Sequence, residues 1–385
     1  MADASVAAWP RRYFKASAGW DWPTGGGPVR TARLLLVSAL LACDPFHTGF
    51  DDLEGAVSYE ASGARDEPDR SAPLRVMNYN VKFGGGRIDF FFDCFGDRVL
   101  MSRAEVHGNL ERLAKKINQY DPDVLVLQEV DVNSKRSAYV DQLQWLLDHS
   151  GLRYGIYASH WKADYIPSDG LGAMDSGNAV LSKYPLTGAQ RIALSLREEQ
   201  SGIERYFYLK RNVLRVKLEV PGKQPTFVVA THADAYSKDG TKKQHIDRFK
   251  QELDELSEAG NTVIGAGDLN TLPPGTEKQV GFPDSVCEDE EFIADDYREE
   301  ADWLVELYDD YTPEVPLDVY QADNARYFSH TVDGRDFWNR KLDYIFTNAS
   351  VVEGSGLVHQ DEERGGMETM PLSDHAPVSV EIELP

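Results

Sequence analysis

Cysteine is scarce in this sequence, and basic residues are outnumbered by acidic ones. Only three cysteines occur among 385 residues, Cys43, Cys94 and Cys287, and their spacing matches no cysteine-based metal site. Forty Lys and Arg residues face 64 Asp and Glu residues, which gives a net charge of −24. Because such a chain repels polyanions at long range, its composition argues against non-specific binding of DNA or RNA.

The sequence also lacks an apolar run long enough to cross a bilayer. The run at residues 34–42 is short and follows Arg30 and Arg33, a layout typical of a secretory signal. Residues 40–43, Leu-Leu-Ala-Cys, resemble the lipobox of bacterial lipoproteins, which implies diacylation of Cys43. We therefore expect residues 1–43 to form a signal segment, with translation starting at Val29, and the protein to be secreted or held at the cell envelope through a lipidated Cys43.

Residues 44–73 are polar and show almost no apolar periodicity, so we expect a flexible linker there. The catalytic domain is predicted to span residues 74–385. If Cys43 is lipidated, Cys94 and Cys287 are left as a disulfide pair or as two free thiols, and the sequence favours neither.

Hydrophobic periodicity in residues 74–385 alternates between strands and helices. Helices are predicted at 102–118, where Ser102 and Glu105 form a capping box, and at 139–147 and 241–259. Residues 123–128 form an apolar strand covered on both faces. Further strands are predicted at 74–81, 154–158, 179–182, 213–220, 227–231, 262–265, 342–346 and 378–382. This order indicates an α+β fold with two packed sheets flanked by helices.

An acidic, aromatic-rich segment at residues 276–340 separates two of these strands. Its residues 284–302 hold ten Asp or Glu against one Arg. We interpret the segment as a solvated insertion, with a specificity loop as the alternative.

Polar side chains lie at the ends of six predicted strands. They belong to the sequences Asn78-Tyr79-Asn80, Leu127-Gln128-Glu129, Thr231-His232, Gly267-Asp268-Leu269-Asn270, Leu342-Asp343-Tyr344-Ile345-Phe346 and Ser373-Asp374-His375. Charged groups beside buried strands are costly unless they are paired or bind a metal, so six such ends predict one shared polar site.

This ordered set resembles the motifs of the endonuclease/exonuclease/phosphatase superfamily, over residues 74 to 385. The resemblance implies a DNase-I-like, four-layer α/β sandwich made of two mixed sheets flanked by helices. It also implies a divalent-metal-dependent hydrolase of phosphoester bonds.

The resemblance gives roles to individual residues. Asn80, Glu129 and Asp374 would hold Mg²⁺, with Mn²⁺ as an alternative, because these ions prefer hard oxygen ligands. Asp268 would activate the attacking water, and Asn270 would donate to a phosphoryl oxygen. The remaining catalytic roles fall to His375, with Asp343 orienting its ring, and to His232.

Two further residues are predicted to bind the substrate. Asn178 matches a family strand that lines the cleft, and Arg211 lies where several relatives carry a phosphate-binding arginine. The Trp-x-x-Asp-Arg motif of inositol-phosphate phosphatases is absent, and residues 337–340 read Phe-Trp-Asn-Arg instead.

The substrate class stays open between a lipid headgroup, a small molecule and a nucleic acid. The acidic composition favours small or membrane-displayed phosphodiesters over duplex DNA. The alternatives are an extracellular endonuclease and, from another class, a catalytically silent binding module on the same fold. Nothing in the sequence predicts a protein partner.

Overall fold

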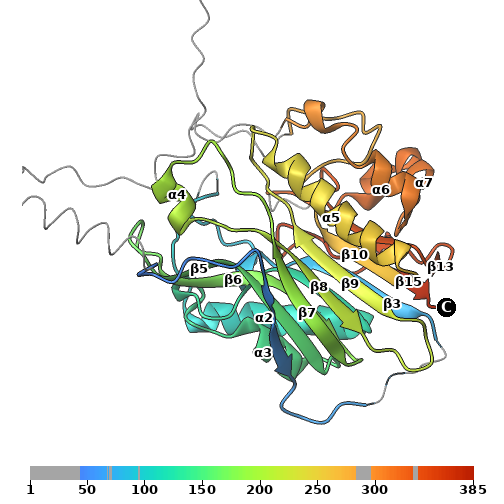
Figure 1. The fold of residues 1–385 in the computed structure, drawn as a ribbon, viewed down its shortest axis with the longest axis horizontal. Helices are drawn as coiled ribbons and strands as arrows, with labels where there is room; N and C mark the ends of the chain where they lie inside the picture. The colour runs from blue at the N-terminus through green and yellow to red at the C-terminus, as the bar shows by residue number, and fades with distance from the viewer. Residues whose placement is uncertain (1–43, 67, 69–71, 94–95, 283–295, 333–336) are drawn as a thin grey trace, which may run out of the picture.

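Two β-sheets packed face to face, with helices on their outer faces, make up the part of the chain that the structure describes (Figure 1). The structure is a computed structural model that describes residues 44–66, 68, 72–93, 96–282, 296–332 and 337–385. The predicted signal segment, Cys43 and the Cys94–Cys287 pair lie outside these residues.

Both sheets are mixed, and each has a parallel pair of strands near its centre. The first sheet runs in the order β1 (Leu53–Gly55), β7 (Leu186–Ala193), β8 (Asn212–Leu218), β9 (Thr226–His232), β10 (Thr262–Asp268), β12 (Asp343–Thr347) and β11 (Thr312–Pro313). The second runs β13 (Ser350–Val351), β15 (Val378–Glu383), β3 (Leu74–Asn80), β4 (Val124–Asp131), β6 (Gly172–Ser182), β5 (Tyr154–Ile166) and β2 (Val57–Glu60), with β14 (Leu357–Val358) beside β15. The parallel pairs are β9 with β10 and β3 with β4.

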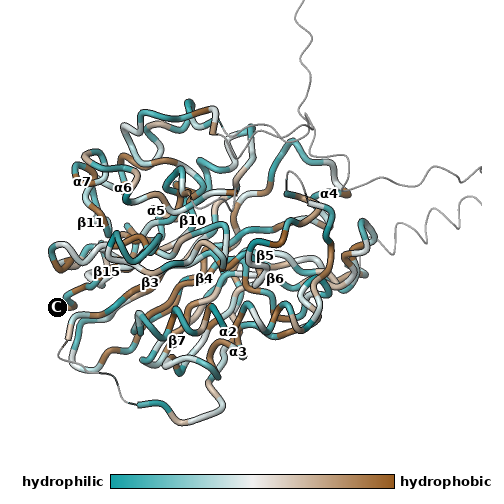
Figure 2. The backbone as a smooth tube through the Cα atoms, turned by 180° about the vertical axis from the view of Figure 1, so that it is seen from behind, coloured by the Kyte–Doolittle hydropathy of each residue, from teal (hydrophilic) through white to brown (hydrophobic). Residues whose placement is uncertain are grey.

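Apolar side chains fill the space between the sheets. Val76 and Val126 of the second sheet belong to one buried cluster with Leu214, Val228 and Ile264 of the first. Successive side chains of a strand point to opposite faces of its sheet, so every second side chain of these strands lies in the layer between the sheets. Hydrophobic segments accordingly follow the strands through the interior in Figure 2.

Three long helices cover the outer faces of the sheets. On the second sheet, α2 (Arg103–Tyr120) and α3 (Gln142–His149) pack in one apolar cluster with β3 and β4. On the first sheet, α5 (Thr241–Glu258) packs against β9 and β10. The capping box at the start of α2 is present as predicted. These layers confirm the predicted α+β sandwich of two mixed sheets flanked by helices.

The remaining elements are short. They are α4 (Gly202–Phe207), α6 (Val305–Asp310), α7 (Leu317–Ala322) and the 3₁₀ turns η2 (Lys82–Gly84), η3 (Lys135–Ser137), η5 (Arg298–Glu300) and η6 (Asn324–Tyr327). No helix among the described residues is long and apolar enough to cross a membrane.

The prediction of a linker without structure is wrong for residues 53–60. β1 pairs with β7 at the edge of one sheet, and β2 pairs with β5 at the edge of the other. No apolar alternation marks these two strands, because an edge strand is held by backbone hydrogen bonds and need not bury its side chains. Leu53 and Val57 are in fact more than half exposed, at 55% and 56%.

The segment predicted as a solvated insertion also packs against the sheets in its described part. β11 pairs with β12, and Leu304, Leu307 and Tyr320 are buried. Glu314 and Lys341 form an ion pair whose side chains are fully buried. The sequence prediction rested on the average composition of the segment. The many acidic residues dominate that average, so the few apolar residues that pack against the sheet were not recognised.

Candidate active site

The ends of five central strands bring the predicted polar residues to one place. Asp268 ends β10, and its backbone is in register with His232 at the end of β9 and with Asp343 at the start of β12. Asn80 ends β3, and β4 carries Glu129 beside it. The carboxyl ends of parallel strands meet at the same edge of a sheet, which explains the pairs β9–β10 and β3–β4. The packing of the two sheets brings these pairs together.

The carboxylate of Asp268 lies at the centre of these contacts and is 1% exposed. Its Oδ2 accepts a hydrogen bond from Asn80 Nδ2 at 3.1 Å, and it lies 3.3 Å from His232 Nε2 and 3.5 Å from His375 Nε2. Its Oδ1 accepts the backbone N–H of Asn270 at 3.0 Å. Burial raises the pKa of Asp268 to about 7, although His375 beside it acts in the opposite direction.

His375 and Asp343 form the predicted dyad. His375 Nδ1 lies 2.7 Å from Asp343 Oδ2, which also accepts a hydrogen bond from Ser329 Oγ at 2.7 Å. Burial alone would lower the pKa of His375, but the charges of Asp343 and Asp268 outweigh it and raise that pKa to about 10. At neutral pH the ring is therefore an imidazolium held in one orientation.

Glu129 occupies a strained position in β4. Its φ is +59°, in the left-handed region, where the pairing of β4 with β6 shifts register between Leu127 and Val130. Bulges of this kind re-aim a side chain, and strained backbone often marks functional residues. The result is that Glu129 Oε1 accepts a hydrogen bond from Asn80 Nδ2 at 3.2 Å. Asn80 therefore joins Glu129 to Asp268.

Asp374 faces the same space but is paired with a lysine. Lys82 Nζ lies 3.7 Å from Asp374 Oδ2 and 3.0 Å from Asp93 Oδ2. Burial would raise the pKa of Asp374, yet Lys82 and His375 lower it below its usual range. The pKa of Glu129 is raised instead, first by burial and then by the charge of Asp374.

The donor set of Asn80, Glu129 and Asp374 suits a hard divalent cation. The carboxylates of Glu129 and Asp374 repel each other across a largely desolvated space, and the amide of Asn80 lies beside Glu129. A second group, made of Asp268, Asp343 and His375, also brings its ligand atoms within 4.8 Å of one another. Asp343 and His375 of this second group already contact each other at 2.7 Å, so the first set is the one that could hold a divalent ion without breaking an existing pair.

The other predicted residues lie around this centre. Asn270 has φ +51°, and its Nδ2 donates to the carbonyl of Ala233 at 3.1 Å, so an Asx-type backbone turn presents its amide. Arg211 Nη1 donates to the carbonyl of His232 at 3.1 Å. Asn178 is fully buried, and its Nδ2 lies 3.3 Å from Asn212 Oδ1. The contacts of Arg211 and Asn178 thus support the strands behind the centre.

Sequence reasoning missed three residues of the site. His330 Nδ1 lies 3.1 Å from His375 Nε2, and its neighbour Ser329 donates to Asp343. Both belong to the segment interpreted as an insertion, where no strand pattern marked them. Lys82 lies two residues after Asn80, and that adjacency was the only available signal.

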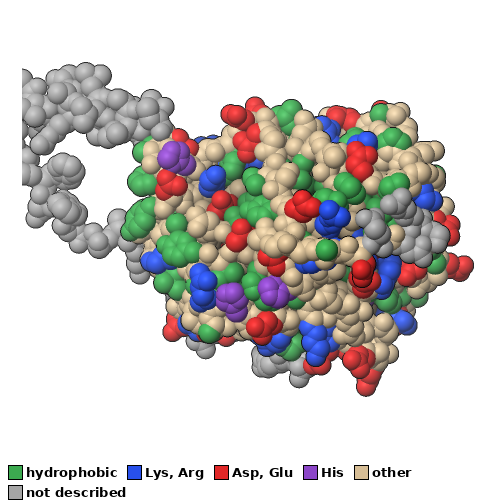
Figure 3. All heavy atoms as spheres, turned by 90° about the horizontal axis from the view of Figure 1, so that it is seen from below, with side chains coloured by type: hydrophobic (Ala, Val, Ile, Leu, Met, Phe, Trp, Pro, Cys, Tyr) green, Lys and Arg blue, Asp and Glu red, His purple; other side chains and the backbone are tan. Residues whose placement is uncertain are grey.

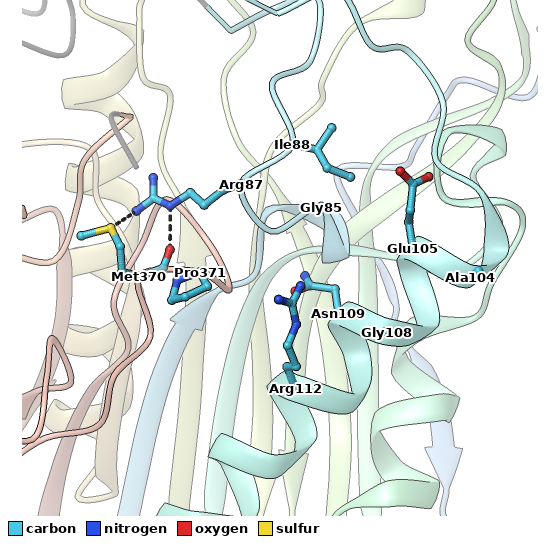
Figure 4. Close-up of a pocket in the computed structure, with 10 residues that line it drawn as sticks. All are labelled: Gly85, Arg87, Ile88, Ala104, Glu105, Gly108, Asn109, Arg112, Met370 and Pro371. Atoms are coloured by element: carbon cyan, nitrogen blue, oxygen red, sulfur yellow. Dashed lines mark hydrogen bonds between the residues drawn. The ribbon is translucent and has the colours of Figure 1, made fainter. Parts of the chain in front are cut away.

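A hollow of about 630 Å³ lies beside the site, between the loop after β3, the loop before Asp374 and α2 (Figure 4). Arg87 spans it: its Nε donates to the carbonyl of Met370 at 2.7 Å, and its Nη1 donates to that of Thr331 at 2.7 Å. None of the predicted site residues lines this hollow. Arg87 therefore ties together the loops that carry His330 and Asp374.

A family model confirms the resemblance. The model described as the endonuclease/exonuclease/phosphatase family matches residues 77–375. The chain belongs to this family. Proteins of this family hydrolyse phosphoester bonds with a divalent metal, and this chain carries a buried cluster of Asp268, Asp343 and His375.

Several solved structures with low sequence identity share the fold. An endonuclease/exonuclease/phosphatase from Beutenbergia cavernae is 20% identical with a TM-score of 0.53, and the match covers 81% of this chain and 72% of that one. The human Nocturnin catalytic domain, solved with a bound sulfate anion, is 16% identical with a TM-score of 0.50, covering 86% and 97%. A conserved protein of unknown function from Enterococcus faecalis is 17% identical with a TM-score of 0.50, covering 81% and 100%. No curated protein matches the sequence.

Proposed function

We propose that this family member is a Mg²⁺-dependent hydrolase of phosphoester bonds, either a phosphodiesterase or a phosphatase, that works outside the cytoplasm. The observation that carries the proposal is the buried Asp268 carboxylate, which lies within 3.5 Å of Asn80, His232 and His375. A carboxylate whose pKa is about 7 is suited to accept a proton from water at neutral pH.

The neighbouring groups complete the proposed chemistry. Asp268 accepts the proton of the attacking water, and His375, as an imidazolium, stabilises the negative charge that grows on the phosphoryl oxygens. Asp343 holds the His375 ring in place. Asn270 offers its amide to the same oxygens. A divalent ion held by Asn80, Glu129 and Asp374 would supply further positive charge for the phosphoryl group.

The surface favours small or membrane-displayed substrates over long duplexes. The net charge is −24, and basic side chains are interspersed with acidic ones on the face seen in Figure 3. A nuclease that gathers DNA normally presents a continuous basic surface. Salt screens charges beyond about 8 Å, so a short substrate near the site is repelled less than a long one.

A panel of substrates tests the proposed activity. We expect bis-p-nitrophenyl phosphate or a lipid phosphodiester to be cleaved with higher kcat/KM than plasmid DNA, at matched Mg²⁺ and low salt. Asp268→Asn protein, purified in parallel, serves as the blank for contaminating enzymes. Efficient plasmid cleavage without activity on lipids or small esters would make the protein an extracellular endonuclease. A folded protein that cleaves nothing would support the binding module.

The proposed location rests on Cys43 and the apolar run before it. A lipidated Cys43 would keep the native protein with the membrane fraction, and Cys43→Ser would release it. Mass spectrometry that finds an unmodified peptide across residues 30–50 in native protein would contradict the anchor.

A further inference from the structure

Lys82 is a buried lysine beside the proposed metal ligands, and the proposed mechanism gives it no role. Its residue exposure is 5%, although lysine is rarely buried without partners. Its Nζ lies between two carboxylates, 3.0 Å from Asp93 Oδ2 and 3.7 Å from Asp374 Oδ2. The side chains of Asp93 and Asp374 are themselves only 13% and 15% exposed.

The backbone is strained to place this ammonium. Lys82 and Phe83 have φ values of +44° and +43°, which non-glycine residues seldom adopt. The surroundings hold the strain: the N–H of Lys82 donates to Asn80 Oδ1 at 3.1 Å, and Gln142 Nε2 donates to the carbonyl of Phe83 at 2.7 Å. Strain that packing maintains is a feature of functional segments.

Asp93 is fixed just as firmly on the other side of the ammonium. Its Oδ2 accepts the backbone N–H of Phe90 at 2.8 Å, and its own N–H donates to the carbonyl of Phe90 at 2.7 Å. The ring of Phe90 packs edge-on against Phe83, with centroids 4.8 Å apart. The two carboxylates are thus held in place by different loops, and Lys82 lies between them.

We propose that Lys82 is a positioning residue that takes the place of a second cation, so that the active site holds one divalent ion. This inference rests on the proposed function, because it concerns the ion held by Asn80, Glu129 and Asp374. In sites with two metal ions the ions lie about 3.5–4 Å apart and share a carboxylate. Here the Lys82 ammonium lies between Asp374 and Asp93, where a second ion would otherwise contact Asp374.

Removal of the ammonium should turn this place into a cation site. Two buried carboxylates without a counter-ion are strongly unfavourable, and a divalent ion with oxygen ligands is the compensation that the solvent offers. The variant Lys82→Met keeps the length of the side chain and removes its charge. The double variant Lys82→Met/Asp93→Asn removes the charge and also one of the two carboxylates.

The test counts Mn²⁺ ions bound to the full chain by equilibrium dialysis with metal analysis. We expect one ion in the wild-type protein, two in Lys82→Met, and one in both Lys82→Met/Asp93→Asn and Lys82→Arg. Two ions in the wild-type protein, or one ion in folded Lys82→Met, would overturn the inference. If Lys82→Met does not fold, Lys82→Gln takes its place and should also bind two ions, and one ion in folded Lys82→Gln would equally overturn the inference. No ion bound by the wild-type protein would contradict the proposed metal dependence itself, a separate result from the role of Lys82.

Discussion

The two sides of the active site differ in how their charges are balanced. On the imidazole side, Asp343 holds His375 at 2.7 Å, and His375 lies 3.5 Å from Asp268. On the carboxylate side, Glu129 accepts one amide hydrogen bond, and Asp374 shares Lys82 with Asp93. The imidazole side is complete within the protein, whereas the carboxylate side has more negative charge than its neighbours neutralise. This difference is the basis of the proposed function, in which the imidazole side moves protons and the carboxylate side holds a cation.

Loss of Asp268 should have the largest effect because this residue joins the two sides. Asp268→Asn keeps the shape and the contacts but removes the base, so we expect kcat to fall by at least about 100-fold. The measurement is the initial rate on bis-p-nitrophenyl phosphate, with circular dichroism to show that the variant is folded. A loss of only a few-fold would mean that another group activates the water.

Glu129→Gln should break the carboxylate side alone. Changes to groups that merely support metal ligands cost about 10–100-fold in metal affinity, so we expect at least that rise in the Mg²⁺ concentration for half-maximal rate. The rate at saturating Mg²⁺ should fall less than in Asp268→Asn. Glu105→Gln, on an exposed helix start, is the matched control and should titrate like the wild-type protein. An unchanged Mg²⁺ requirement in Glu129→Gln would remove it from the ligand set.

The imidazole side should be visible in the pH dependence of stability. The pKa of His375 is about 10 in the folded protein, above its ordinary value of 6.5. Its contribution to the free energy of unfolding is therefore fully present below pH 6.5 and is lost as pH rises through 10. The pKa of Asp268 is about 7, so the titration of Asp268 changes the free energy of unfolding mainly below pH 7, outside the range in which His375 loses its proton.

Thermal unfolding in EDTA between pH 7 and 10 checks this assignment. The wild-type protein should lose more stability across that window than His375→Asn, because the variant lacks the titrating ring. Parallel curves for the two proteins would show that the ring is not charged in the folded state.

His330 should matter least of the four because it contacts the dyad from outside. Its Nδ1 lies 3.1 Å from His375 Nε2. A hydrogen bond to a charged group is worth about 1.5–3 kcal/mol, but the contacts of the His375 ring with Asp343 and Asp268 remain when His330 is replaced. We therefore expect His330→Gln to reduce kcat/KM by about tenfold. His107→Gln, on α2, provides the control. A loss as large as that of Asp268→Asn would make His330 a catalytic residue in its own right.

The central site was predictable because its residues sit at the ends of strands with clear apolar patterns. Asn80, His232 and Asp268 each end a strand. His232 and Asp268 end neighbouring strands of one sheet, and the packing of the other sheet brings Asn80 against Asp268. Asp343 was equally visible at the start of β12. The family motifs then gave these positions their expected roles.

The features of the fold and the site that could not be predicted from the sequence depend on contacts between segments far apart in the chain. Lys82 lies in a strained turn, and His330 lies in a loop of the acidic segment. Neither residue belongs to a run of alternating or helical hydrophobic periodicity that a sequence reading could detect. β1 and β2 are edge strands whose side chains are largely solvent-facing, so no apolar alternation marked them. The left-handed backbone of Glu129 is likewise set by the register shift against β6.

The most direct test of the central claim is the metal dependence of hydrolysis by the wild-type protein. Activity on bis-p-nitrophenyl phosphate is measured in EDTA, and again after Mg²⁺ or Mn²⁺ is restored in excess. We predict that activity is lost in EDTA and recovers with either ion, because the carboxylate side needs a cation to complete the site. Full activity in EDTA would contradict the assignment of Asn80, Glu129 and Asp374 to a catalytic metal.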